Sequence, residues 1–500
     1  MPDPLPTPVI TLSMGQLYPW KSSISLNRQS NRAMYLQIVD ALIHEIVSGR
    51  LAPEYKMPGS RYLASLLELN RKTVSIAYDE LTAQGWLKTI PAKGTFVSDS
   101  LPQMRPVAPT DAPTSTYLPE TSHFKFATLV SSFRSSPKAQ LRITDGSPDV
   151  RLAPTEEIYR WCRQVAKSAT SLRYQDEQGD PYLRDTLAQY LRETRGLVCQ
   201  TEQILITRGS QMGIFLAFQS LLRAGDTVIV GEVSYPEANR VITLCGGNRQ
   251  EVPVDEQGLS TDAIKAICQR QPVRALYITS HHYYPTTVTL SIDRRMKLLA
   301  LAQKYGFAIV EDDYDYDFHY ASSPLLPLAS LDTHGCVIYL GSFTKCIAPA
   351  IRVGYLAAPT DFIRAITPYR RLIDRQGDPV MERALAKWIE AGDLQRHVKK
   401  SLRIYRERRN FLSQYLREHL GCTFSFQEPE GGMATWVRCT PSVDPLKLAQ
   451  YTASQKVSLE GVEDWQHYRG IRLGFASLTS DELARGMDVV VDGIQHIQKK

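Results

Sequence analysis

A lysine beside two small hydroxyl side chains stands between apolar segments in YLGSFTKCIAPAIRVGYL, residues 339–356. Ser342 and Thr344 lie three and one residues before Lys345, and Arg352 follows in the same segment. For a single lysine, a snorkelling or salt-bridged side chain is the commoner explanation. A partly desolvated ε-amine, however, has a lowered pKa and attacks aldehydes, so Lys345 is also a candidate Schiff-base lysine.

An aldehyde cofactor on this lysine makes further demands on the sequence. Pyridoxal 5'-phosphate (PLP) needs a carboxylate at its ring nitrogen, a donor for its ring oxygen and a stacking aromatic. FAIVEDDYDYDF puts Asp312 and Tyr314 directly after a strand-like run, where the side chains of an open α/β sheet face the ligand crevice. Tyr235 in GEVSYPEAN is a candidate stacking residue. A solvated acidic turn and ordinary core packing are the alternative interpretations.

PLP also needs a phosphate site. In ITRGSQMGIFLAF a strand-like run turns into an apolar helix, and backbone N–H groups at such a helix start bind phosphate. Taken alone the signal is weak, because many strand–helix turns contain Gly-Ser. The predicted phosphate site consists of Gly209, Ser210 and Gln211 at the turn, with Ser342, Thr344 and Arg352 near the lysine.

The composition is that of an ordinary globular protein, with 43% hydrophobic and 22% charged residues among 500. This length suggests two or three domains. The eight cysteines include no C-x-x-C pair, which argues against a disulfide scaffold or a zinc ribbon and suits a reducing cytoplasm. The first residues do not resemble a secretory signal, and no apolar run of ~20 residues is present. We therefore predict a cytoplasmic protein without a membrane span and without a metal site.

The sequence divides into four zones: an N-terminal extension (1–33), a helical block ending in a hairpin (34–99), a linker rich in Pro, Ser and Thr (100–140), and a long C-terminal domain (141–500). In the C-terminal domain, strand-like runs alternate with helical patterns. This alternation predicts an α/β fold with a mainly parallel sheet. The six predicted strands lie in QILIT, DTVIVGE, ALYITS, FAIVEDD, CVIYLGS and RVGYLAA.

The block 34–99 has the pattern of a winged helix-turn-helix. Three helical stretches, YLQIVDALIHEIVSG, SRYLASLLELN and NRKTVSIAYDELTAQG, precede two β-like runs around Pro91-Ala92-Lys93-Gly94. Asn70 is a suitable N-cap for the third helix, which would enter the major groove. A protein-binding helical domain and a solvated basic face are the alternatives. The candidate DNA contacts are Arg61, Arg71, Lys72, Thr73, Ser75, Lys93 and Gly94.

Family resemblance favours DNA binding. IVSGRLAPEYKMPGSRYLAS, NRKTVSIAYDELTAQGWL and KGTFV resemble the DNA-binding domain of the GntR family. This family usually has Ser at the position of Asn70, and often Gly-Val at the positions of Glu68 and Leu69. Because Asn also caps helices, the first difference costs little, whereas the second affects the turn before the third helix.

From Asp145 onward the chain resembles the fold-type I aminotransferases. The motifs DGSPDVRLAP, LRYQDEQGDPYLRDTLAQYL, ILITRGSQMGI, VEDDYD, SFTKCIAPAIRVGYL and GIRLGFASL occur in the order of that family. The resemblance implies that Lys345 carries PLP and that Asp312, Tyr314 and Tyr235 take the roles described above. It also implies a cofactor neighbour in His281 and an arginine for a substrate carboxylate in Arg472. Tyr174 resembles the tyrosine that reaches the partner subunit's cofactor, which requires a homodimer.

The chain departs from the aminotransferase pattern at two places. In SHHYYPTTVT, His282 stands where relatives have Gln, and Thr287 stands where they have Gly. A non-glycine residue at that turn alters how closely the backbone can approach a ligand. Val233-Ser234 replaces the usual Pro-Gly before Tyr235, which weakens the assignment of that tyrosine. We expect His282 to have a structural role.

A GntR-like block joined to an aminotransferase-like domain resembles the MocR/GabR group of bacterial transcription regulators. The resemblance implies a PLP-dependent regulator that binds operator DNA as a homodimer and senses an amino compound or PLP itself. A working aminotransferase with a tethering DNA-binding domain is the main alternative. A cofactor-free domain that serves only for dimerisation is a third.

Overall fold

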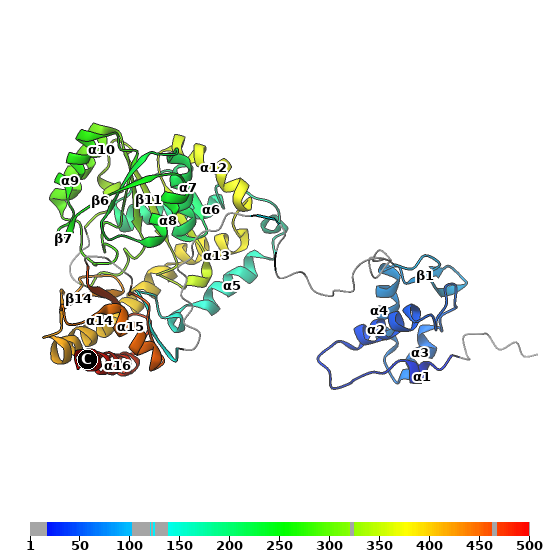
Figure 1. The fold of residues 1–500 in the computed structure, drawn as a ribbon. Helices are drawn as coiled ribbons and strands as arrows, with labels where there is room; N and C mark the ends of the chain where they lie inside the picture. The colour runs from blue at the N-terminus through cyan, green and yellow to red at the C-terminus, as the bar shows by residue number, and fades with distance from the viewer. Residues whose placement is uncertain are drawn as a thin grey trace, which may run out of the picture. The chain divides into compact units, whose positions relative to one another are not determined.

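The computed structural model describes residues 18–102, 121, 124–125, 139–320, 325–462 and 468–499. The chain separates into two compact units, Met1–Val130 and Ser131–Lys500. We call the first unit the head and the second the C-terminal unit (Figure 1). Most of the predicted linker lies outside the described residues.

The head contains the three predicted helices and the predicted hairpin. The N-cap at Asn70 is confirmed, because its side chain accepts a hydrogen bond of 2.8 Å from the backbone N–H of Lys72. The third helix buries one face through residues at helical spacing, Val74, Ala77, Tyr78 and Leu81. The elements are α2 (Met34–Val47), α3 (Ser60–Leu67), α4 (Arg71–Ala83) and the antiparallel strands β1 (Leu87–Ile90) and β2 (Gly94–Val97).

Within the head, part of the N-terminal extension packs on the three-helix block. The short helix α1 (Trp20–Ser23) inserts Trp20, which is 1% exposed, into the same apolar core as Ile38 and Leu42 of α2. Ile24 joins this core. Two isolated apolar residues make no periodic pattern, so their burial in this core was not predicted from the sequence.

The C-terminal unit is built on a seven-stranded sheet. Its strand order is β4-β12-β11-β10-β9-β5-β6, in which β12 runs antiparallel to both neighbours and the other pairs are parallel. All six predicted strands are confirmed. The polar NRQEV of β6 has no strand-like apolar run, and that strand was not predicted. The strands are β4 (Ile204–Thr207), β5 (Thr227–Gly231), β6 (Asn248–Val252), β9 (Ala275–Ile278), β10 (Ala308–Asp313), β11 (Val337–Ser342) and β12 (Gly354–Ala357).

Helices cover both faces of this sheet, as Figure 1 shows in green and yellow. Alternate side chains of a strand point to opposite faces. Thus Val228 and Val230 of β5 pack in one apolar cluster with α7, whereas Ile229 packs in another with α9 and α10. The helices of this region are α5 (Thr155–Val165), α6 (Pro181–Arg195), α7 (Gly209–Leu221), α8 (Pro236–Leu244), α9 (Thr261–Arg270), α10 (Ile292–Tyr305), α11 (Leu328–Leu331), α12 (Thr360–Asp374) and α13 (Pro379–Glu390).

A smaller lobe, orange and red in Figure 1, contains the C-terminal elements. Its antiparallel sheet has the order β13-β14-β16, and β3 pairs in parallel with β15. The lobe's elements are β3 (Leu141–Ile143), α14 (Asp393–Leu420), β13 (Phe424–Phe426), β14 (Ala434–Cys439), α15 (Pro445–Ser454), β15 (Val457–Leu459), β16 (Gly470–Gly474) and α16 (Ser480–Gln498).

The remaining elements are short. They are β7 (Val254–Asp255), β8 (Gly258–Leu259) and the 3₁₀ turns η2 (Val150–Leu152), η3 (Ala169–Leu172), η4 (Thr201–Gln203) and η5 (Pro349–Ile351). Among the described residues, no helix is both long and apolar enough to cross a membrane.

Candidate cofactor site and nucleic-acid interface

Lys345 lies in the turn that joins β11 to β12. Its side chain is half-buried, and its Nζ donates a hydrogen bond of 2.6 Å to the carbonyl oxygen of Gly146. Burial lowers the pKa of Lys345, against the opposing effect of Asp145 and Asp315. A lowered pKa increases the fraction of neutral amine, which is the nucleophilic form.

Asp312 is the penultimate residue of the buried strand β10 and is 3% exposed. Tyr277 of the neighbouring strand β9 donates a hydrogen bond of 2.9 Å to Oδ2 of this carboxyl. The other oxygen, Oδ1, is buried and has no hydrogen-bond partner among the described residues. Burial raises the pKa of Asp312 to about 7, although the bond from Tyr277 opposes this shift. An unpartnered buried acceptor is costly, so this atom suits a ligand that brings a donor.

The predicted phosphate residues meet where α7 begins. The backbone of Gly209 has a φ of +74°, and a Cβ at this position would lie 3.0 Å from Nη2 of Arg352. Gly354 of β12 passes against Gly209 equally closely, since a Cβ there would lie 2.8 Å from the Cα of Gly209. Both positions therefore require glycine. The start of α7 has no side-chain cap, which leaves its first N–H groups, including those of Ser210 and Gln211, for a ligand.

Hydroxyl and guanidinium groups surround this helix start. Nη2 of Arg352 donates a bond of 2.8 Å to the carbonyl oxygen of Arg208. Ser342 and Thr344 are joined by a hydrogen bond of 2.9 Å between their hydroxyls. Together these groups would offer a phosphate several hydrogen-bond donors and one fixed positive charge.

Tyr235 packs edge-on against Tyr284, with ring centroids 5.4 Å apart. The hydroxyl of Tyr284 donates a hydrogen bond of 3.2 Å to Asp145, and the guanidinium of Arg472 lies 4.9 Å from the centre of its ring. Neither Tyr284 nor Tyr277 was predicted from the sequence to belong to the site. Tyr284 stands immediately before Pro285 in SHHYYPTTVT, and this position in the motif could have indicated that it belongs to the site.

Arg472 and Tyr314 are hydrogen-bonded to each other. Nη2 of Arg472 donates to the Tyr314 hydroxyl at 3.1 Å, and this hydroxyl donates to the carbonyl oxygen of His282 at 2.8 Å. Arg472 is 2% exposed, and its other donors reach the carbonyl oxygens of Asp145 and Pro285. None of the described carboxylates forms an ion pair with Arg472. A buried guanidinium without a carboxylate partner favours binding of an anionic ligand.

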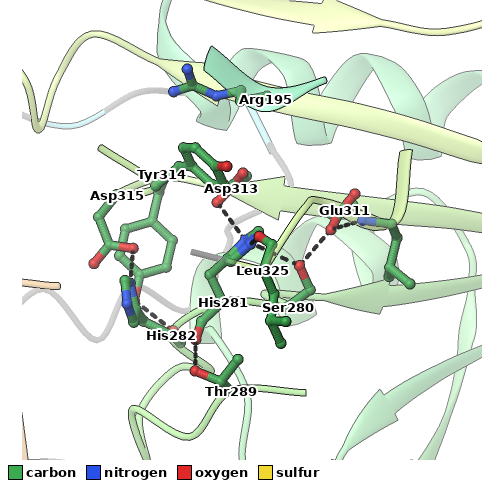
Figure 2. Close-up of polar contacts among 12 residues, drawn as sticks. Arg195, Ser280, His281, His282, Thr289, Glu311, Asp313, Tyr314, Asp315 and Leu325 are labelled. Atoms are coloured by element: carbon green, nitrogen blue, oxygen red, sulfur yellow. Dashed lines mark hydrogen bonds and ion pairs between the residues drawn. The ribbon is translucent and has the colours of Figure 1, made fainter. Parts of the chain in front are cut away.

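The remaining acidic residues of EDDYD each have a protein partner, as Figure 2 shows. His281 lies 3.2 Å from Asp313 through Nδ1, and its Nε2 lies 2.5 Å from the carbonyl oxygen of Leu325. His282 contacts Asp315 at 2.7 Å. Burial by itself raises the pKa of Asp313, but His281, Arg195 and Tyr339 together outweigh this effect and the pKa falls to about 2. Both ring nitrogens of His281 thus have partners, and no described contact joins it to Lys345 or Asp312.

The structure also shows the backbone of Thr287 and the surroundings of Tyr174. Thr287 has a φ of +63°, the left-handed backbone for which relatives use glycine at this turn. Tyr174 is 78% exposed, and its ring lies 4.8 Å from the guanidinium of Arg375. No described contact joins Tyr174 to the site of its own chain, and its predicted action on a partner subunit remains a prediction.

In the head, the predicted DNA contacts gather at the start of α4, the start of α3 and the β1–β2 turn. Nε of Arg71 donates to the Ser60 hydroxyl at 3.5 Å, which connects the beginnings of the two helices. Thr73 and Ser75 are half-buried. The exposed members of the set are Arg61, Arg71, Lys72, Lys93 and Gly94. Their roles on DNA remain predictions.

Comparison with known proteins relates each unit to a protein family. Residues 144–490 match the family model for aminotransferase class I and II, and residues 34–97 match that for bacterial regulatory proteins of the gntR family. A multiple substrate aminotransferase from Thermococcus profundus aligns with a TM-score of 0.67 and 26% identity, covering 73% of this chain and 93% of the other. The kynurenine aminotransferase of Pyrococcus horikoshii, solved in complex with PMP, also aligns with a TM-score of 0.67 and 26% identity, over 71% and 91%.

Relatives that span both units are regulators by name. The HTH-type pyridoxine biosynthesis transcriptional regulator PdxR of Corynebacterium glutamicum is 30% identical over 79% of this chain and 81% of its own length. The HTH-type transcriptional regulator TauR of Rhodobacter capsulatus is 30% identical over 83% and 86%. The chain belongs to the aminotransferase class I and II family, and its gntR-type head makes it a member of the MocR/GabR group of transcription regulators.

Proposed function

We propose that this chain is a PLP-dependent transcription regulator. Its head binds operator DNA, and its C-terminal unit senses an amino compound or PLP itself at Lys345. The observation that carries the proposal is the buried, unpartnered Oδ1 of Asp312 in the same site as a lysine whose pKa is lowered by burial. A cytoplasmic location suits both DNA and this cofactor.

The residues present fit PLP. When bound, PLP supplies an aldehyde that bonds to amines and an electron-withdrawing ring. In this proposal Lys345 binds the aldehyde carbon, Asp312 accepts a hydrogen bond from the ring nitrogen through Oδ1, and Tyr235 stacks on the ring. The phosphate would bind at Gly209, Ser210, Gln211, Ser342, Thr344 and Arg352.

Tyr314 would donate a hydrogen bond to the ring oxygen of PLP, and Arg472 would bind the effector. For Tyr314 to donate to the ring oxygen, its hydroxyl must release the carbonyl oxygen of His282. The bond from Arg472 supports the hydroxyl in either arrangement. Arg472, buried without a carboxylate partner among the described residues, would bind the carboxylate of an amino-acid-like effector.

The proposal includes a homodimer. Tyr174 would reach the cofactor phosphate of the partner subunit, because its side chain is exposed and contacts Arg375 rather than a residue of its own chain's site. Dimerisation would also pair two heads, which suits two spaced half-sites on DNA. An effector changes DNA affinity only if it binds two conformations of the dimer unequally.

One experiment tests the cofactor and the regulation together. The purified chain is incubated with PLP, reduced with borohydride and digested, and the peptide masses are measured by mass spectrometry. We expect the reduced cofactor on the peptide that contains Lys345. In parallel, amino compounds and PLP are titrated while binding to the DNA upstream of its own gene is followed. An unmodified Lys345, or DNA affinity that no titrant changes, would contradict the proposal.

A further inference from the structure

Residues 18–33 form an N-terminal strap along the head. Trp20 and Ile24 anchor the strap in the head's core, and α1 packs on α3. Between and beyond these anchors the strap carries three cations, Lys21, Arg28 and Arg32. The ion-pair partners of these cations show which parts of the head the strap contacts.

Two of these cations meet at one residue, Glu68. Nζ of Lys21 lies 3.2 Å from Oε1 of Glu68, and Nη2 of Arg28 lies 4.0 Å from Oε2. Arg28 also donates a bond of 3.4 Å to the backbone oxygen of Glu68. Glu68 is the C-cap of α3 and stands two residues before Asn70, the N-cap of α4. The strap thus places two cations at the turn of the helix-turn-helix.

The backbone at this turn is strained. Glu68 has a φ of +56°, a left-handed conformation that costs a residue with a Cβ roughly 1 kcal/mol relative to glycine. A glycine would avoid this cost. The carboxylate of Glu68 is instead the group that both strap cations, Lys21 and Arg28, contact.

Stability alone does not explain the two cations. The side chains of Lys21 and Arg28 are 72% and 65% exposed, and exposed ion pairs contribute little to folding. Two cations facing one carboxylate leave a net positive charge at the turn. The adjacent helix start adds the positive end of the α4 dipole and the exposed Arg71 and Lys72. This combination suits the phosphate backbone of DNA.

We propose that the N-terminal strap is part of the DNA interface, with Lys21 and Arg28 contacting phosphates beside the half-site read by α4. The inference rests on DNA binding by the head and adds a second surface to it. Phosphate contacts position a protein without reading sequence. The strap should therefore change the salt dependence of binding and leave the preference for the operator unaltered.

The test compares two exposed arginines of the strap in the full-length protein. Arg28→Gln removes a proposed phosphate contact. Arg32→Gln is the matched control, because Arg32 pairs with Asp40 of α2 at 2.7 Å rather than with the turn. Binding to the DNA upstream of its own gene and to a mixed-sequence duplex is measured by fluorescence anisotropy over a series of salt concentrations. Each phosphate contact adds about one to the slope of log affinity against log salt.

We expect Arg28→Gln to reduce this slope by about one per head on both duplexes, and Arg32→Gln to leave it unchanged. Equal slopes for the two variants would overturn the proposal, while wild-type binding would still uphold the function of the head. Heat unfolding shows whether either variant is destabilised. If Arg28→Gln is, Arg28→Lys decides, because a restored slope supports a phosphate contact and an unrestored slope contradicts it.

Discussion

The head and the C-terminal unit draw their working residues from the chain in different ways. In the head, the candidate DNA contacts come from two short stretches around α3–α4 and the β1–β2 turn, and most are exposed. In the C-terminal unit, Lys345, Asp312 and Arg472 are brought from separate strands and loops. Gly146, which accepts the hydrogen bond from Lys345, comes from the other end of the unit's sequence.

This difference follows from what each surface must bind. DNA is met by exposed charges that keep their hydration until binding, so affinity depends strongly on salt. The cofactor site instead shifts the proton affinity of its groups through burial, which raises the pKa of Asp312 and lowers that of Lys345. Variants in the two units should therefore differ in what they change, and four predictions test this separation.

The largest effect should come from Lys345→Ala. Removing the amine leaves no group to bond the aldehyde, so PLP should no longer remain on the protein through gel filtration. Binding to a mixed-sequence duplex at low salt should persist, because the head is unaltered. Visible absorbance of the protein fraction and DNA anisotropy measure the two outcomes.

Lys304→Ala, an exposed lysine of α10, is the control and should retain the cofactor. A Lys345→Ala protein that keeps its visible absorbance would refute the assignment of Lys345.

Asp312→Asn should stabilise the cofactor-free protein at high pH. The pKa of Asp312 is raised from 3.8 to about 7, so the site favours the neutral acid. Its contribution to stability is complete below pH about 4 and is lost as pH rises through about 7. Because each pKa unit corresponds to about 1.4 kcal/mol, the variant should exceed the wild type by about 4 kcal/mol at high pH. Denaturant unfolding of the C-terminal unit at several pH values measures this.

At low pH the Asp312→Asn and wild-type curves should meet. Asp293→Asn, at an exposed position of α10, should stay within about 0.5 kcal/mol of the wild type throughout. A constant difference between Asp312→Asn and wild type across pH would mean that the carboxyl does not titrate in this range.

Tyr174→Phe should weaken PLP binding by about 10- to 100-fold, since a hydrogen bond to a charged group contributes about 1.5–3 kcal/mol. Subunit association should be unchanged, because the ring remains. Equilibrium dialysis against PLP and sedimentation measure the two quantities. Tyr159→Phe, another exposed tyrosine at 56%, serves as the control. Equal cofactor affinities in both variants would remove Tyr174 from the shared site.

Arg71→Ala should weaken operator binding by about 1–3 kcal/mol per half-site if the side chain reads a base. Retention of PLP should be unaffected. Footprinting on the DNA upstream of its own gene gives the first result and visible absorbance the second. Arg32→Ala removes another exposed arginine and should leave the footprint intact. If Arg71→Ala protects the same site as the wild type, α4 is not the reading helix.

Much of the fold was readable from local pattern. Helical spacing and the cap at Asn70 predicted the head, and apolar runs predicted six strands of the large sheet. Strand β6 was not predicted, because its residues are polar. The burial of Trp20 was not predicted either, because it depends on packing against a helix elsewhere in the head. Of the candidate site, the order of motifs indicated Lys345, Asp312 and Arg472 but neither Tyr277 nor Tyr284.

The sequence by itself determined which functional groups the protein has and which strands they follow. It also determined that a glycine stands at the start of α7, where the backbone has a positive φ. Tertiary structure alone decided the environment of each group. The pairing of β9 with β10 directs the hydroxyl of Tyr277 to Oδ2 of Asp312, whereas Oδ1 has no hydrogen-bond partner among the described residues. Whether an atom is desolvated and partnered depends on segments far apart in the chain, and such contacts leave no periodic signature in the sequence.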